Sequence, residues 1–97
     1  MGRQYYVYIV TNKVNGTLYT GMTDSLIRRT WEHQTEAAEG FTKKYGCKIL
    51  VYYEVADSKE SALRREKTIK KWPRKWKLNA INEMNPEWND LYEYVCQ

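Results

Sequence analysis

The stretch "QYYVYIVTNKVNGTLYTG", residues 4–21, decides the fold of the N-terminal half. Residues 4–11 are rich in tyrosine, valine and isoleucine, which favour β-strands. The pair Asn15-Gly16 is typical of a turn, and residues 17–21 form a second strand-like run that ends at a glycine. We therefore expect an antiparallel β-hairpin.

Two registers are compatible with this hairpin. A loop of Asn15 and Gly16 alone offsets Tyr8 from Tyr19 by roughly four residues, ~13 Å, whereas a four-residue loop over residues 12–15 places them directly opposite, ~5 Å apart. Both registers put the two tyrosines on the same face of the sheet. Taken alone, this pattern favours an aromatic pair that covers the sheet.

Downstream of the hairpin, the sequence predicts a helix from residue 26 to about residue 36, capped by Asp24 or Ser25. Its inner side is expected to carry Leu26, Ile27, Thr30 and Trp31. Residues 36–47 are expected to form a loop. Residues 48–55, "KILVYYEV", are predicted to be a third strand, and their nearly continuous apolar character favours a central or well-covered position.

The remainder of the chain is predicted to be helical. One helix opens at Asp57 or Ser58 and cannot continue through Pro73, where another begins and runs to about Met84. Residues 88–95 have helical spacing but are too few to assign. The predicted order is β-β-α-β-α-α, a small α+β fold.

Length and composition limit the function. Ninety-seven residues predict a single domain over residues 1–97, with a core of about residues 4–86 and a short C-terminal tail. The formal charge of +4 favours a polyanionic partner. No apolar run approaches the ~20 residues that cross a membrane, and no secretory signal is apparent. Cys47 and Cys96 lack metal-ligand spacing and, in a chain without a signal peptide, are interpreted as ordinary reduced thiols. We therefore expect a cytoplasmic protein with no membrane partner.

The first predicted helix carries Arg29 and His33 four residues apart, so they share one face. Arg29 follows Leu26 by three residues and therefore lies at or near the buried stripe, where a guanidinium needs an anionic partner. For an arginine taken alone, a salt bridge is the usual explanation. For His33 alone, a surface or capping position is the default.

The next helix has a carboxylate on its apolar stripe. Glu66 is expected to share this inward stripe with Ala62, Leu63 and Ile69. An inward carboxylate needs a cation, either a lysine or arginine or a metal ion. From these residues alone we favour the ion pair by about two to one.

Basic residues are concentrated around Glu66. Residues 64–77 contain eight of the sixteen lysines and arginines, interleaved with Trp72 and Trp76. A solvated basic face explains the lysines, but phosphate binding explains the asymmetry better. With Arg28, the residues expected to bind nucleic acid are Arg28, Arg64, Arg65, Lys67, Lys70, Lys71, Arg74, Lys75 and Lys77.

The ordered motifs resemble a known family. Tyr6-Val7-Tyr8, then Tyr19-Thr20-Gly21, then Arg29, His33 and an isolated Glu66 are similar to the GIY-YIG nuclease domain, in particular its short stand-alone subgroup. The likeness covers about residues 4–86. It implies a small, mixed-order sheet of three antiparallel strands flanked by helices.

The resemblance also implies an activity, the hydrolysis of nucleic-acid phosphodiesters with Mg²⁺ or Mn²⁺ and without a small-molecule cofactor. It makes Glu66 the metal ligand and Arg29 the group that stabilises phosphate charge. Tyr8 or Tyr19 would activate or position the water, with His33 assisting. One carboxylate suffices for Mg²⁺, which keeps most of its waters and takes further ligands from substrate phosphate.

The chain departs from the family pattern at several positions. Tyr6 replaces a glycine, Thr20 replaces an isoleucine, and Met22 stands where some relatives carry lysine. No second domain is apparent. We therefore expect selection of nucleic-acid structure rather than sequence, with any sequence specificity coming from a protein partner.

Three functions are compared. The first is a structure-selective DNA endonuclease of repair or recombination, and the second is a DNA- or RNA-binding module that retains the nuclease fold without cutting. The third, a protein-interaction domain, leaves the basic run unexplained. We expect Tyr8, Tyr19, Arg29, His33 and Glu66 to converge in one solvent-accessible concavity. A structure with Glu66 on the opposite side of the sheet from Tyr19 would end the nuclease interpretation.

Overall fold

A computed structural model describes residues 4–37 and 40–97. Its three strands form one antiparallel sheet in the order β2-β1-β3, with bounds β1 Tyr5–Thr11, β2 Leu18–Thr23 and β3 Ile49–Ala56. The helices are α1 Leu26–Gln34, α2 Phe41–Tyr45, α3 Lys59–Lys71, α4 Arg74–Met84 and α5 Tyr92–Val95. The predicted α+β class and the three-stranded antiparallel sheet are confirmed.

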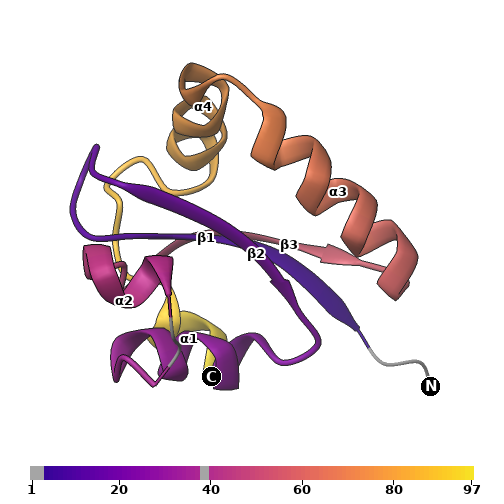
Figure 1. Ribbon diagram of the computed structural model, residues 1–97, viewed down its shortest axis with the longest axis horizontal. Coiled ribbons are helices and arrows are strands. Elements are labelled where there is room, and N and C mark those ends of the chain that lie inside the picture. Colours follow the sequence, from indigo (N-terminus) through magenta and orange to yellow (C-terminus); the bar gives the residue numbers. More distant parts are fainter. Residues whose placement is uncertain (1–3, 38–39) are drawn as a thin grey trace.

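The sheet separates two helical layers (Figure 1). Because side chains alternate along a strand, Val7 and Ile9 of β1 pack with α3 and α4, while Tyr8 and Val10 pack against α1 on the opposite face. The helices α1, α2 and α5 all lie on that second face. A group on α3 can therefore meet one on α1 only around an edge of the sheet.

The hairpin adopts a register between the two expected ones. Tyr8 lies opposite Gly21, and Tyr19 lies opposite Val10. The pairing ends at Thr11 and Leu18, because the turn is widened by side chains: Thr11 Oγ1 donates to two loop carbonyls and the Asn12 side chain accepts from the Thr17 amide. Both expected registers are wrong, but the shared face of Tyr8 and Tyr19 is correct.

The third strand does not take the central position. β1 is central and β3 is an outer strand, with Val55 52% exposed. Leu50 and Val51 are nevertheless fully buried. The C-terminal segment covers this end of the strand, since the Leu91 amide donates to the Leu50 carbonyl and Asp90 accepts from the Leu50 amide. This cover accounts for the apolar character of an edge strand.

Three helical details differ from expectation. The buried stripe of α1 consists of Leu26, Thr30 and His33, whereas Ile27 and Trp31 are about half exposed. On α3, Leu63 is also exposed, although Ala62 and Ile69 are buried as predicted. The expected loop contains the short helix α2; residues 38–39 of that loop lie outside the described residues.

The predicted start of α3 is confirmed at Ser58, whose side chain accepts from the Ser61 amide at 3.1 Å in a capping box. Pro73 immediately precedes α4, and its ring ends α3 as expected. Among the described residues, no helix combines the length and apolar character that a membrane span requires.

Candidate active site

The site begins with the close approach of Tyr8 to Gly21 on β2. A Cβ atom added to Gly21 would lie 2.5 Å from the Tyr8 hydroxyl oxygen and 3.1 Å from the Tyr19 ring. Such distances are far inside van der Waals contact, so only glycine at this position lets the Tyr8 ring cross the edge strand. Tyr8 is 1% exposed in this seat.

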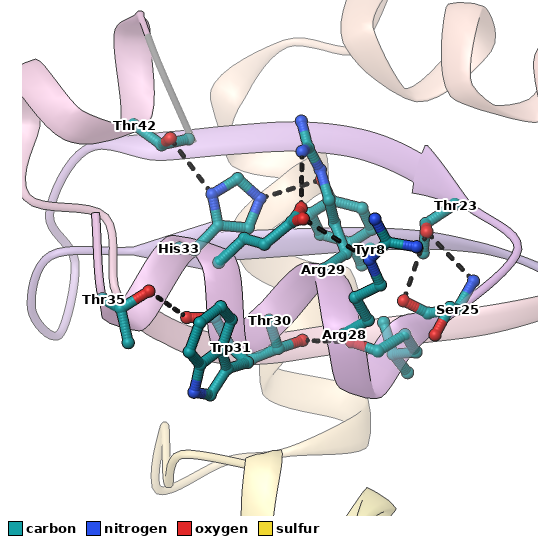
Figure 2. Close-up of polar contacts among 12 residues, drawn as sticks. Tyr8, Thr23, Ser25, Arg28, Arg29, Thr30, Trp31, His33, Thr35 and Thr42 are labelled. Atoms are coloured by element: carbon teal, nitrogen blue, oxygen red, sulfur yellow. Dashed lines mark hydrogen bonds and ion pairs between the residues drawn. The ribbon is translucent and has the colours of Figure 1, made fainter. Parts of the chain in front are cut away.

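The Tyr8 hydroxyl meets a histidine from α1. His33 Nε2 lies 2.9 Å from Tyr8 Oη, and His33 Nδ1 lies 3.0 Å from Thr42 Oγ1 on α2. Figure 2 shows the imidazole between these two hydroxyl groups. Both ring nitrogens are thus bonded, which fixes the ring orientation.

Arg29 is the third member of this group. Its Nε donates to Tyr8 Oη at 3.4 Å, and a terminal guanidinium nitrogen pairs with Glu32 at 2.9 Å (Figure 2). Arg29 also lines a hollow of about 240 Å³ with Arg28, Glu32 and residues 23–25. Part of the guanidinium therefore faces solvent, where an anion could reach it.

Burial sets the protonation states of Tyr8 and His33. Desolvation raises the pKa of Tyr8 to about 12 against the lowering effect of Arg29. Desolvation and the nearby Arg29 charge lower the pKa of His33 to about 4. At neutral pH the pair is therefore a protonated phenol beside a neutral imidazole.

Tyr19 extends the site along the edge strand. Its ring centroid lies 6.0 Å from that of His33, and Lys70 Nζ of α3 lies 5.8 Å from the Tyr19 ring centroid. Since Tyr19 faces α1 and Lys70 comes from the opposite layer, this contact passes around the β2 edge.

Glu66 is placed differently from the expectation. The helix α3 packs on the sheet face opposite Tyr19, so Glu66 lies on the far side of the sheet from that tyrosine. By the criterion given above, this outcome ends the nuclease interpretation for a site on one face, and a site that includes Glu66 has to run around an edge of the sheet. Glu66 pairs with Lys70 at 3.3 Å, and its charge contributes to the raised pKa of Tyr8. Glu66 thus acts electrostatically on Tyr8, and its partner Lys70 lies over the Tyr19 ring at the β2 edge.

The expected single concavity is not observed. Tyr8 and His33 are 1% and 3% exposed, and of the five predicted residues Arg29 alone lines the hollow beside α1. Tyr8 and His33 are buried, and the absence of a side chain at Gly21 leaves room for the Tyr8 ring in this position. The Glu66–Lys70 contact is the ion pair that the residues alone favoured.

Four of the nine basic residues make side-chain hydrogen bonds or ion pairs with other residues that the structure describes. Arg74 donates to the carbonyl oxygens of Asn15 and Gly16, which ties α4 to the hairpin turn. The others contact carboxylates: Arg28 with Glu32, Arg65 with Glu54 and Lys70 with Glu66.

The other basic residues lie on α3 and α4. Lys77 is half-buried, and burial with the charges of Arg74 and Lys70 lowers its pKa. The exposed members are Arg64, Lys67, Lys71 and Lys75.

Two components of the site were missed. Thr42 orients His33 from α2, but the sequence around it was expected to be a loop, with no signal pointing to the histidine. Gly21 was interpreted as the end of a strand rather than as the residue against which the Tyr8 ring packs. Its position two residues after Tyr19 could have suggested a close approach.

Replacing Gly21 with alanine is expected to destabilise the protein by about 1–3 kcal/mol, because the new methyl group displaces the Tyr8 ring. Where the new methyl group has room, replacing glycine with alanine stabilises a protein by about 0.4–1 kcal/mol. The sign of the change in the free energy of unfolding therefore tests whether Tyr8 packs tightly against Gly21. Denaturant unfolding measures it, and a more stable Gly21→Ala protein would contradict the tight seat.

Stability should also fall on mild acidification. His33, the only histidine, has a pKa of about 4 in the folded protein against 6.5 in the unfolded chain, so below pH 6.5 the unfolded state binds the extra proton. The free energy of unfolding should drop by roughly 2 kcal/mol between pH 7 and pH 5. A His33→Gln protein should lack this drop. Equal pH dependence of the two proteins would disprove the assignment.

Comparison with known proteins identifies the class. The GIY-YIG catalytic domain model matches residues 4–79. The chain belongs to the GIY-YIG family, which is a family of nucleases.

Individual relatives are similar over most of their length. The UPF0213 protein SH2523 of Staphylococcus haemolyticus is 41% identical over 82% of this chain and 96% of its own. The UPF0213 protein CPE1444 of Clostridium perfringens is 39% identical over 79% of this chain and 82% of its own. The solution NMR structure of the UPF0213 protein BH0048 of Bacillus halodurans has 30% identity and a TM-score of 0.56, covering 90% of this chain and 92% of that one.

Proposed function

We propose that this protein is an endonuclease that hydrolyses DNA phosphodiesters with Mg²⁺ or Mn²⁺. It selects DNA structure rather than sequence and acts in repair or recombination in the cytoplasm. The observation that carries the proposal is the hydrogen-bonded group of Tyr8, His33 and Arg29 at the β2 edge. Phosphodiester hydrolysis needs a proton acceptor and a cation side by side, and this group supplies both.

In the proposed reaction Tyr8 Oη takes a proton from the attacking water as it passes its own proton to His33 Nε2. The low pKa of His33 keeps the imidazole neutral at neutral pH. The proposed step uses the tautomer in which Nδ1–H donates to Thr42 Oγ1 and Nε2 accepts from Tyr8. We assign this role to Tyr8 rather than Tyr19 because the Tyr8 hydroxyl contacts the histidine. Tyr8 is buried, so Arg29 must swing toward the phosphate to uncover it.

Glu66 is the residue that would hold the metal ion. The described residues contain no cluster of three or more His, Cys, Asp or Glu suited to a metal. A single carboxylate can hold Mg²⁺, because that ion keeps most of its waters and takes further ligands from substrate phosphate. Lys70 must release Glu66 for this to occur. When bound, the ion would neutralise charge on the phosphate and the leaving oxygen.

The basic surface of α3 and α4 would follow the DNA backbone. Phosphate contacts carry little sequence information, so binding should depend on salt and not on base sequence. A protein partner would then supply any sequence specificity.

The test is incubation with labelled branched, flapped and single-stranded DNA, with Mg²⁺, with Mn²⁺ or with EDTA. Cleavage of a structured substrate that stops in EDTA supports the proposal. Failure to cut any of these substrates with either metal contradicts it.

A second candidate is a DNA- or RNA-binding module that does not cut. The observation in its favour is the Glu66–Lys70 ion pair, which occupies the only carboxylate assigned to the metal. Salt-dependent binding without cleavage, with Glu66→Gln changing neither property, would favour this candidate.

A further inference from the structure

A row of aromatic rings leads away from the candidate active site onto α2. Tyr19 stacks on Phe41 with ring centroids 5.8 Å apart and planes inclined by 29°, and Phe41 contacts Tyr45 at 4.6 Å. Tyr19 also contacts His33, so the row is continuous with the Tyr8–His33 pair. We call Tyr19, Phe41 and Tyr45 the aromatic row.

The outer part of this row is open to solvent. Phe41 is 44% exposed and Tyr45 is 43% exposed, although burial would stabilise both rings. Phe41 is the only phenylalanine in a chain with nine tyrosines and four tryptophans. Its ring has no polar atom that would explain its position at the surface by hydrogen bonding.

Cations accompany the rings. Lys44 Nζ lies 5.4 Å from the Tyr45 ring centroid, and Lys70 Nζ lies 5.8 Å from that of Tyr19. Lys43, also on α2, is exposed. Aromatic faces beside lysines complement a ligand that has flat rings on an anionic backbone, which is the chemistry of nucleic acid.

We propose that the aromatic row binds unpaired nucleotides next to the scissile phosphate, so that the preferred substrate has a single-stranded segment on the α2 side of the site. This inference rests on the proposed nuclease function, because it names the substrate of the same site. Bases inside a duplex are stacked on each other and present no free face to Phe41 or Tyr45. Unpaired bases do, and stacking on aromatic rings tolerates any sequence.

Binding is measured in EDTA, so the result does not depend on cleavage. Phe41→Ala and Tyr45→Ala should each weaken binding of a labelled oligo(dT) by about 5-fold to 100-fold, with little effect on a duplex of equal length. Tyr94→Ala is the matched control, since Tyr94 is 64% exposed on α5 and lines a separate groove. Unchanged oligo(dT) binding by the folded row variants, or equal losses for duplex and single strand, would overturn the proposal.

A second measurement needs no substitution. Because the chain has one phenylalanine, 4-fluorophenylalanine labels Phe41 alone. Its fluorine resonance should shift with oligo(dT) or oligo(rU) but not with duplex, and the two oligonucleotides distinguish DNA from RNA. A resonance that saturating amounts of either single strand leave unmoved would overturn the proposal.

Self-association is the competing use of the row. Sedimentation of the wild-type protein and the Phe41→Ala protein detects it, and a dimer that dissociates on this substitution would overturn single-strand binding. A protein that prefers single strands but cuts no substrate would support nucleotide binding by the aromatic row and refute the proposed nuclease activity. The two hypotheses can therefore fail independently.

Discussion

Replacing Glu66 with glutamine should lower metal-dependent cleavage by about 100-fold or more, while DNA binding stays unchanged or becomes slightly tighter. As a metal ligand, Glu66 contributes nothing to attraction for a polyanion and instead repels it. The substitution also frees Lys70, which lies over the Tyr19 ring and can then contact phosphate. Cleavage and binding should therefore change independently.

Thermal stability separates this role from a structural one. The Lys70 side chain is 48% exposed, and such an ion pair contributes under about 1 kcal/mol, so Glu66→Gln should melt close to the wild type. Glu54→Gln is the matched control, because Glu54 is also paired with a cation of α3 but lies away from the β2 edge. It should cut at the wild-type rate. A Glu66→Gln protein that does the same would refute the metal-ligand role.

Replacing Arg29 with alanine should lower cleavage by about 100-fold to 1,000-fold and weaken DNA binding at the same time. The guanidinium lines the hollow beside α1 and donates to Tyr8. In the proposed reaction it would therefore meet phosphate in both the bound state and the transition state. Single-turnover cleavage and binding in EDTA measure the two effects.

The control for charge alone is Lys59→Ala, an exposed cation at the start of α3 that removes the same unit of charge. It should leave the single-turnover rate unchanged. Arg29→Lys should recover binding better than cleavage, because lysine keeps the charge but loses the planar fork that grips phosphate through two bonds. Full cleavage by Arg29→Ala would exclude Arg29 from the chemistry.

The sequence predicted the secondary-structure elements, and the family resemblance grouped Tyr8 with Arg29 and His33. Neither predicted how deeply Tyr8 and His33 are buried. Strand propensity and the Pro73 break placed the hairpin and the later helices, and the spacing of Arg29 and His33 placed them on one helix face. The surface or capping position expected for His33 taken alone was wrong, because its burial depends on Tyr8 and Thr42, which come from β1 and α2. Hydrogen bonds between distant segments leave no periodicity in the sequence.

The sequence also did not predict how the helices are distributed between the two faces of the sheet. The stripe of Ala62, Glu66 and Ile69 predicts which side of α3 faces the sheet, but not which face of the sheet it covers. The apolar run of β3 suggested a central strand because the cover supplied by Asp90 and Leu91 belongs to another part of the chain. Both errors concern tertiary packing rather than local structure.

Assembly of the site around the β2 edge has a consequence for synthesis. Tyr8, Arg29 and His33 leave the ribosome early, and at ~5–20 residues per second Glu66 follows seconds later. A nascent chain that ends at α1 holds the tyrosine and arginine but lacks the carboxylate and the opposite helical layer. In the proposed nuclease, hydrolytic competence would arise only when α3 docks, so an unfinished chain beside messenger RNA would not cut it.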